Sequence, residues 1–316
     1  MKFRTEIIIR DAGLQISHQD KILMMGSCFV ENLSSKALLS GFTVETNPFG
    51  IVYNPISIAD GLSDLINNRI YSDKDLFLHR GLYHSFSHHS CFSGTDIEAV
   101  LNNINSSRTN FSNFLQQTNL LIITFGTANT YRLLSSGAIV ANCHKLPAKY
   151  FKEERLTVNQ ITEQWNSLIK TIRVKNPQLK ILFTVSPVRH WKDGAHENQI
   201  NKSILLLTVN ELVNTNAFCY YFPSYEIMMD DLRDYRFYAE DMIHPNSQAI
   251  DYIWDKFSPA YFDKTTLELI KEWKSIQQAL NHRPFHPESD EYKRFLEKTE
   301  KRKQTFWKLK NIKEQG

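Results

Sequence analysis

Short apolar segments alternate with longer amphipathic segments along most of this chain. The apolar segments are typical of buried strands, and turn-forming residues follow them. They lie at residues 22–25, 42–46, 120–125, 181–185 and 218–222. Helical spacing of apolar residues predicts helices at residues 28–40, 55–66, 96–117, 157–175, 197–213, 247–257, 267–280 and 291–310. This alternation predicts an α/β fold with a mainly parallel sheet, whose functional loops lie at the carboxyl ends of the strands.

Two further elements are predicted outside this pattern. Residues 2–9 have the alternating character of an edge strand. Residues 131–134 and 138–141 flank a Ser-Ser-Gly turn and predict a hairpin. The chain has 316 residues, which one large α/β domain with extensions can fill. We expect the main domain to span residues 1–262 and appended helices to fill residues 263–316.

Charge and hydropathy exclude two classes of partner. Residues 291–316 carry nine Lys and Arg against four Glu, a net charge of +5, so the rest of the chain is about −2 by difference from the total of +3. The main domain is therefore not a basic platform for nucleic acid. The longest apolar runs are far shorter than a membrane span, and residues 1–20 lack a continuous apolar stretch. We expect a cytoplasmic protein with no membrane partner; these features do not predict its oligomeric state.

Cysteine and histidine patterns give no strong metal site. The four cysteines are widely spaced without a C-x-x-C pair, which argues against a zinc knuckle or a disulfide scaffold. If residues 79–94 were helical, His84 and His88 would share a face and could bind a metal. The glycine, serine and aromatic residues of this segment favour an irregular strand and loop instead. No metal and no cofactor are predicted.

Ser27 and a later Asp-x-x-His sequence together suggest nucleophilic catalysis. Ser27 follows the first predicted strand at a glycine turn, and Asp241 and His244 lie in the loop before the helix predicted at residues 247–257. A nucleophilic serine needs a base within hydrogen-bond reach and a carboxylate that fixes the imidazole tautomer. These residues therefore predict a triad in the chain order Ser, Asp, His.

Two other interpretations of these residues stay open. Ser27 could cap the first helix, and Asp241 and His244 could be a structural pair at another helix entrance. Cys28 could be the nucleophile, because a thiol at a helix N-terminus has a lowered pKa. Its side chain, however, is expected to point away from Ser27, into the packing of the helix.

Several ordered motifs in residues 20–260 resemble the GSCFA domain family. They are Gly26-Ser27-Cys28-Phe29-Val30, NPFGIVYNP at residues 47–55, GTA at 126–128, ANCHK at 141–145, SPVRH at 186–190 and the late Asp241-x-x-His244. One difference is Val30, where the family motif has alanine. That family is similar to the SGNH/GDSL hydrolases, so the resemblance implies a flavodoxin-like three-layer α/β/α sandwich.

The resemblance also implies roles for individual residues. Ser27 would be the nucleophile, His244 the general base and Asp241 the residue that orients the base. The backbone N–H groups of Ser27 and Gly50, with a side-chain amide, would form the oxyanion hole. In SGNH enzymes the amide comes from a G-x-N-D block, but here Asn129 stands one position late.

Other residues are candidates for the cavity wall. Because Asn129 stands one position late, Asn129 and Asn142 both remain open as the amide donor. His144, Arg189 and His190 are expected to line the pocket, and Arg189 and His190 could hold a substrate anion. The leading hypothesis is a serine ester hydrolase that removes a short acyl group from a small substrate, such as a carbohydrate. Acyl transfer by the same triad and a non-catalytic ligand-binding protein are the alternatives.

Overall fold

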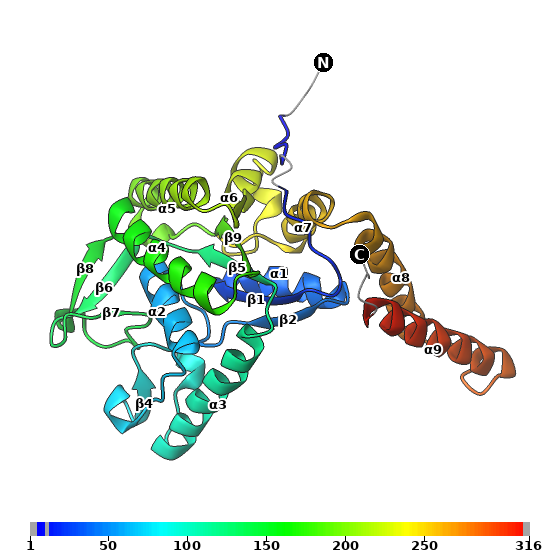
Figure 1. Cartoon of the computed structure of the whole chain (residues 1–316), viewed down its shortest axis with the longest axis horizontal. Helices are drawn as coiled ribbons and strands as arrows, with labels where there is room; N and C mark the ends of the chain where they lie inside the picture. The colour runs from blue at the N-terminus through cyan, green and yellow to red at the C-terminus, as the bar shows by residue number, and fades with distance from the viewer. Residues whose placement is uncertain (1–4, 10–12, 312–316) are drawn as a thin grey trace.

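A five-stranded parallel sheet forms the centre of the molecule, in a computed structural model that describes residues 5–9 and 13–311 (Figure 1). Its strands are β1 (Lys21–Gly26), β2 (Thr43–Thr46), β5 (Leu120–Phe125), β9 (Lys180–Val185) and β10 (Cys219–Phe222). They lie in the order β10-β9-β5-β1-β2, and all neighbours are parallel. Counted along the chain, this is the order 2-1-3-4-5 of flavodoxin-like doubly wound sheets. The predicted fold class is confirmed.

Helices cover both faces of the sheet. They are α1 (Cys28–Leu39), α2 (Pro55–Ile66), α3 (Ile97–Leu115), α4 (Val158–Lys175), α5 (Ala195–Thr215) and α7 (Ser247–Tyr261). Successive strand residues point to opposite faces. Met24 accordingly packs in the cluster of α1 and α7, whereas Met25 packs in the cluster of α2, α3, α4 and α5. The result is a three-layer α/β/α sandwich.

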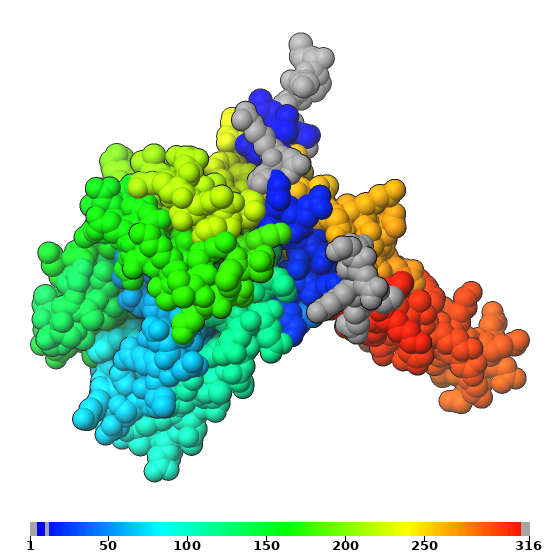
Figure 2. All heavy atoms as spheres, in the orientation of Figure 1, coloured from blue at the N-terminus to red at the C-terminus, as the bar shows by residue number. Residues whose placement is uncertain are grey.

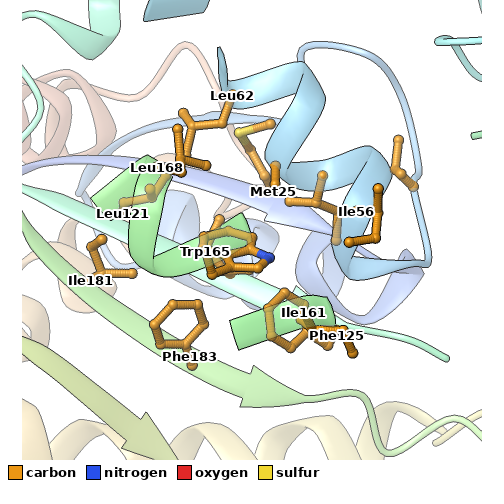
Figure 3. Packing of buried hydrophobic residues seen from close by; sticks show 14 of the residues in the cluster. Met25, Ile56, Leu62, Leu121, Phe125, Ile161, Trp165, Leu168, Ile181 and Phe183 are labelled. Atoms are coloured by element: carbon orange, nitrogen blue, oxygen red, sulfur yellow. The ribbon is translucent and has the colours of Figure 1, made fainter. Parts of the chain in front are cut away.

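Trp165 of α4 joins several elements of the larger core (Figure 3). Its ring centroid lies 5.3 Å from that of Phe125 and 5.2 Å from that of Phe183, on adjacent strands. Its indole Nε1–H donates to the Pro55 carbonyl of α2 at 3.1 Å, so its one polar group is satisfied. Truncating such a buried aromatic residue typically costs about 3–5 kcal/mol. The helix α4 is thereby fixed both to the sheet and to α2.

Smaller sheets lie beyond the central one. β3 (Leu76–His79) pairs with β4 (Leu82–Ser85), and β6 (Asn129–Leu133) lies between β7 (Ile139–Val140) and β8 (Phe151–Arg155), all antiparallel. The predicted hairpin is confirmed as β6 and β7. The strand β8 was not predicted, because its sequence FKEER has no apolar alternation; it is held by backbone pairing with β6.

The predicted strand at residues 2–9 is not found in the part that can be assessed. Residues 5–9 form no strand, and residues 2–4 lie outside the described residues. Short helical turns fill other connections, at Asp73–Asp75, Ser90–Phe92, Ala148–Tyr150, Trp191–Asp193, Ser224–Glu226, Ile227–Asp231 and Tyr235–Phe237.

Two C-terminal helices, α8 (Lys264–Leu280) and α9 (Asp290–Asn311), form a hairpin that extends away from the sandwich (Figure 2). The rings of Trp273 and Phe306 stack between them with centroids 4.6 Å apart. The base of the hairpin is fixed to the main body, because Lys310 Nζ donates to the Gly41 carbonyl at 2.6 Å. None of the helices in the described residues combines the length and apolarity that a bilayer crossing requires.

Buried histidines make the stability of this fold dependent on pH. Burial is the main cause that lowers the pKa of His18 and His144 to about 4 and that of His88 to about 3. In the unfolded chain these groups bind a proton below about pH 6.5, whereas the folded state excludes it. The stability that comes from keeping these histidines neutral is therefore fully present above pH 6.5, and it is lost as the pH falls toward 4.

We accordingly expect acidification to destabilise the protein. Between pH 6.5 and 4 each of these histidines contributes a loss of about 1.4 kcal/mol per pH unit, so urea unfolding at pH 5 should show a loss of several kcal/mol relative to pH 7. His18→Gln should make this slope shallower. An unfolding free energy that is equal at pH 5 and pH 7 would contradict the assignment.

Candidate active site

A cavity of about 510 Å³ opens at the carboxyl ends of the central strands. In a sheet of this order, ligands bind where the strand order reverses, which here lies between β1 and β5. Ser27 directly follows β1 and lines the cavity. Arg189 and His190 reach the same cavity from the loop after β9, and His244 reaches it from the loop before α7. The fold thus brings together residues that are more than 200 positions apart in the chain.

Gly26 sets the position of Ser27. Its φ of 137° is in a region that side-chain-bearing residues rarely adopt, and a Cβ there would lie 2.1 Å from the Thr124 carbonyl oxygen. Only glycine lets the end of β1 pass this close to β5. The chain then turns into α1, and the N–H of Ser27 donates to the same Thr124 oxygen at 3.2 Å.

The side chain of Ser27 does not cap the helix α1 that follows it. Ser27 is the N-cap residue of α1, but its hydroxyl forms no capping hydrogen bond. Its Oγ is buried and has no hydrogen-bond partner within the described residues. A buried hydroxyl without a partner costs about 1–3 kcal/mol. Helix capping therefore does not explain this serine, whose hydroxyl is left without a partner in a residue that lines the cavity.

Asp241 forms three hydrogen bonds within one turn, and two of them are with His244. One carboxylate oxygen lies 2.6 Å from His244 Nδ1, and the other accepts the backbone N–H groups of Ile243 and His244, both at 2.9 Å. These backbone bonds, and then the bond to the imidazole, lower the pKa of Asp241 to about 2. The carboxylate therefore stays ionised at neutral pH. It holds the His244 proton on Nδ1 and leaves Nε2 as the basic nitrogen.

Ser27 and His244 line one cavity but form no hydrogen bond with each other. Ser27 is buried, whereas the His244 side chain is 48% exposed and lies on an irregular loop between the turn at Tyr235–Phe237 and α7. Hydrogen bonds between catalytic groups are often long without substrate and shorten in the substrate complex. A direct bond between Ser27 and His244 would therefore need the two side chains to lie closer together than they do in this structure.

The backbone groups expected in the oxyanion hole are already occupied. The Gly50 N–H donates to the Asn47 carbonyl at 2.8 Å, and Gly50 is not among the residues that line the cavity. A Cβ at Gly50 would lie 2.4 Å from Cβ of His89, so this glycine is needed for a close contact between loops. The structure gives Gly50 a structural role and leaves it outside the site. The Ser27 N–H, in turn, is bonded to Thr124.

Both asparagines left open by the sequence line the cavity. The Asn129 amide Nδ2 donates to Glu153 at 2.5 Å, a carboxylate that holds it strongly. The Asn142 amide has only a long contact of 3.4 Å to the Ser90 hydroxyl, while its Oδ1 accepts the His144 N–H at 2.8 Å. Asn142 is therefore the amide whose N–H groups are more readily available to a ligand.

The two predicted pocket histidines have different positions. His144 is buried behind the cavity, where Nε2 contacts the Ser85 carbonyl at 2.8 Å and the ring lies 4.5 Å from that of His84. His190 does line the cavity, edge-on to Tyr53 with ring centroids 5.5 Å apart. Burial, then the charges of Lys202 and His244, lower the pKa of His190 to about 4. His190 is thus a poor base at neutral pH.

Cys28 is among the residues that line the same cavity as Ser27. The structure corrects the expectation that its thiol has a lowered pKa. Burial, and then the charge of Glu31, raise the pKa of this thiol, although the backbone N–H groups of Phe29 and Cys28 act in the opposite direction. Desolvation outweighs the effect of the helix terminus. The thiolate is therefore disfavoured, which weakens Cys28 as the nucleophile.

Lys202 is a site residue that the sequence did not reveal. It is fully buried on α5, and Nζ donates to the carbonyls of Gly126 and Ser186, each at 2.7 Å. These carbonyls directly follow β5 and β9, so one ammonium group holds together two loops under the cavity. A signal was present: Lys202 lies on the apolar face of its helix, in register with Leu205 and Val209.

The histidine-rich segment forms strand and loop structure, as its composition favoured. His84 belongs to β4, and His88 is buried against the Ser85 hydroxyl at 2.9 Å. Among residues 5–9 and 13–311, no group of three or more His, Cys, Asp or Glu side chains is arranged to hold a metal ion.

Comparisons with known proteins agree with the motifs in the sequence. The sequence model of the GSCFA family matches residues 21–257, and that of the GSCFA domain protein, C-terminal domain, matches residues 273–311. A search of curated protein sequences returns no match.

The solved structures that match this chain are only distantly similar to it. A family 3 carbohydrate esterase from Clostridium thermocellum is 11% identical, with a TM-score of 0.38 over 80% of this chain and 97% of that chain. A carbohydrate esterase family 3 structure from Talaromyces cellulolyticus is 11% identical, with a TM-score of 0.36 over 80% and 99%. Similarity at this level assigns no residue roles. The sequence match covers well over half of the chain, and this protein belongs to the GSCFA family.

Proposed function

We propose that this protein is a serine ester hydrolase that removes a short acyl group from a small hydroxylated substrate, such as a carbohydrate. The observation that carries the proposal is the hydroxyl of Ser27, which is buried and has no partner among the described residues, in a cavity that it shares with an imidazole held by Asp241. A carboxylate-oriented histidine beside a free serine hydroxyl is the arrangement that nucleophilic acyl transfer requires.

The reaction would proceed in two stages. With the two side chains within hydrogen-bond reach, His244 Nε2 would accept the Ser27 proton while Oγ attacks the ester carbonyl. The tetrahedral intermediate then expels the alcohol, which takes the proton from His244, and leaves an acyl group on Ser27. In the second stage His244 activates a water molecule, which releases the acid and restores Ser27.

The oxyanion would be stabilised by groups that differ in part from those expected from the sequence. The N-terminus of α1 begins next to Ser27, and the positive end of its dipole favours negative charge there. Asn142 is the proposed amide donor, because its N–H groups are weakly engaged. One such donor is worth about 3–4 kcal/mol of barrier. Gly50 is not part of this proposal.

The test is hydrolysis of short p-nitrophenyl esters and of acetylated sugars by the purified protein, followed by release of p-nitrophenol and of acetate. We expect turnover that saturates with substrate. Addition of a sugar acceptor separates hydrolysis from transfer, since a transferase would form acylated sugar in place of free acid. Complete absence of turnover, with retained ligand binding, would favour the alternative of a binding protein, which the missing Ser27–His244 bond keeps open.

A further inference from the structure

Arg189 lies at the junction of two cavities. The active-site cavity and a neighbouring cavity of about 590 Å³ are both lined by Arg189, Trp191 and Ile243. The second cavity continues along an apolar wall that includes Met228 and Tyr238. A substrate that extends beyond the reacting ester would therefore pass the guanidinium group of Arg189.

The guanidinium group of Arg189 has no acidic partner within the described part of the chain. Its Nε is buried and lacks a hydrogen-bond partner, and the group lies 5.0 Å from the centre of the Trp191 ring. A guanidinium has five N–H donors and stays charged under all ordinary conditions. A buried donor left without an acceptor is costly, so a ligand that supplies acceptors here gains binding energy.

Neighbouring charged groups are already paired. Around the second cavity, Arg233 pairs with Asp230 at 2.6 Å. Asp234 pairs with Arg236 at 2.7 Å, and Asp241 is bonded to His244. None of these carboxylates neutralises Arg189.

A second cation lies behind the first. The buried ammonium of Lys202 is bonded to two neutral carbonyl groups and not to a carboxylate. The pKa of Lys202 is lowered to about 7, mainly by burial; Cys28 acts in the opposite direction, and the charge of Arg189 acts in the same direction as burial. In the active-site cavity Lys192 and Asp193 are adjacent and of opposite sign, so they largely offset one another. The charge of Arg189 is therefore not neutralised by these side chains, and Lys202 adds positive charge when it is protonated.

We propose that Arg189 binds an anionic group of the substrate, a carboxylate or a phosphate, while the ester lies over Ser27. The planar fork of a guanidinium matches both groups by two parallel hydrogen bonds. This inference rests on the proposed hydrolase function and narrows its substrate class to acylated small molecules that carry a negative charge.

The first test measures specificity. Wild-type protein and Arg189→Gln are compared on acetylated glucose, acetylated glucuronic acid and acetylated glucose 6-phosphate. The wild type is expected to prefer at least one charged ester over the neutral one by tenfold or more in kcat/KM, and Arg189→Gln should bring that ratio close to one. Arg302→Gln, a control whose guanidinium is paired with Glu272 and which lines neither cavity, should keep the wild-type ratio. The charged ester with the higher kcat/KM shows whether Arg189 binds a carboxylate or a phosphate.

The second test does not depend on catalysis. Thermal unfolding of Ser27→Ala is measured with inorganic phosphate or glucuronate, against chloride of equal ionic strength. At least one anion should raise Tm, and Ser27→Ala/Arg189→Gln should lose that rise. If wild-type protein hydrolyses no ester but this anion effect stands, the hydrolase proposal fails and the anion site holds. Equal kcat/KM for charged and neutral esters, or a Tm rise that persists without Arg189, would overturn the inference.

Discussion

Ser27→Ala is expected to lower kcat/KM for ester hydrolysis by about 10⁴-fold or more, because it removes the atom that forms the acyl-enzyme; loss of a nucleophilic serine elsewhere costs up to about 10⁶ in kcat. The fold should not suffer. The hydroxyl forms no hydrogen bond within the described residues, so its removal should leave the free energy of unfolding unchanged or raise it by about 1 kcal/mol. Stopped-time assays with p-nitrophenyl acetate and urea unfolding measure the two effects.

Two further variants test whether the loss of activity is specific to Ser27. Ser35→Ala removes an exposed serine of the same helix and should keep full activity. Cys28→Ala removes the neighbouring thiol in the same cavity and should keep the serine-dependent reaction, since the raised pKa of Cys28 disfavours its thiolate. If Cys28→Ala abolished turnover and Ser27→Ala retained it, the nucleophile would be the thiol.

His244→Ala is expected to reduce kcat by about 10³-fold or more, since no other histidine with an orienting carboxylate lines the described part of the cavity. Asp241→Asn should cost less, about 10²- to 10⁴-fold, because the imidazole remains but is no longer held in the required tautomer. Rate measurements at pH 7 should therefore rank Ser27 and His244 above Asp241.

Other histidines test whether this loss is specific. His282→Ala, in the exposed connection of the C-terminal hairpin, should leave kcat unchanged. His190→Ala is expected to act mainly on KM, because the lowered pKa of His190 makes it a weak base in the cavity wall. A kcat that is retained in His244→Ala and lost in His190→Ala would transfer the role of base to His190.

Local patterns predicted most of the fold because they report interactions within single elements. Asn54 caps α2 through its side chain, and Asp96 caps α3 in the same way, at the starts of two helices that apolar spacing predicted. The buried strands were visible as apolar runs. The strand β8 was not predicted because it forms through backbone pairing with β6, a long-range contact that its charged sequence does not reveal.

The side chains of the candidate site could be predicted, because their chemistry follows from residue type. The backbone N–H groups that are free to bind a ligand could not be predicted. The residues Ser27, Asp241 and His244 could be named from sequence. The engagement of the Gly50 N–H by Asn47 could not, because it depends on the conformation of the turn. The partial burial of Cys28 reversed the direction expected for its pKa, since burial depends on contacts across the whole fold.

The central claim is that Ser27 is the reactive nucleophile. Its most direct test is to treat the folded protein with a fluorophosphonate probe and to locate the adduct by mass spectrometry in the tryptic peptide of residues 22–36, where fragment ions distinguish Ser27 from Cys28, Ser34 and Ser35. We predict one adduct per chain, on Ser27, that disappears in His244→Ala. A protein that stays unlabelled, or an adduct on any other residue, would contradict the claim.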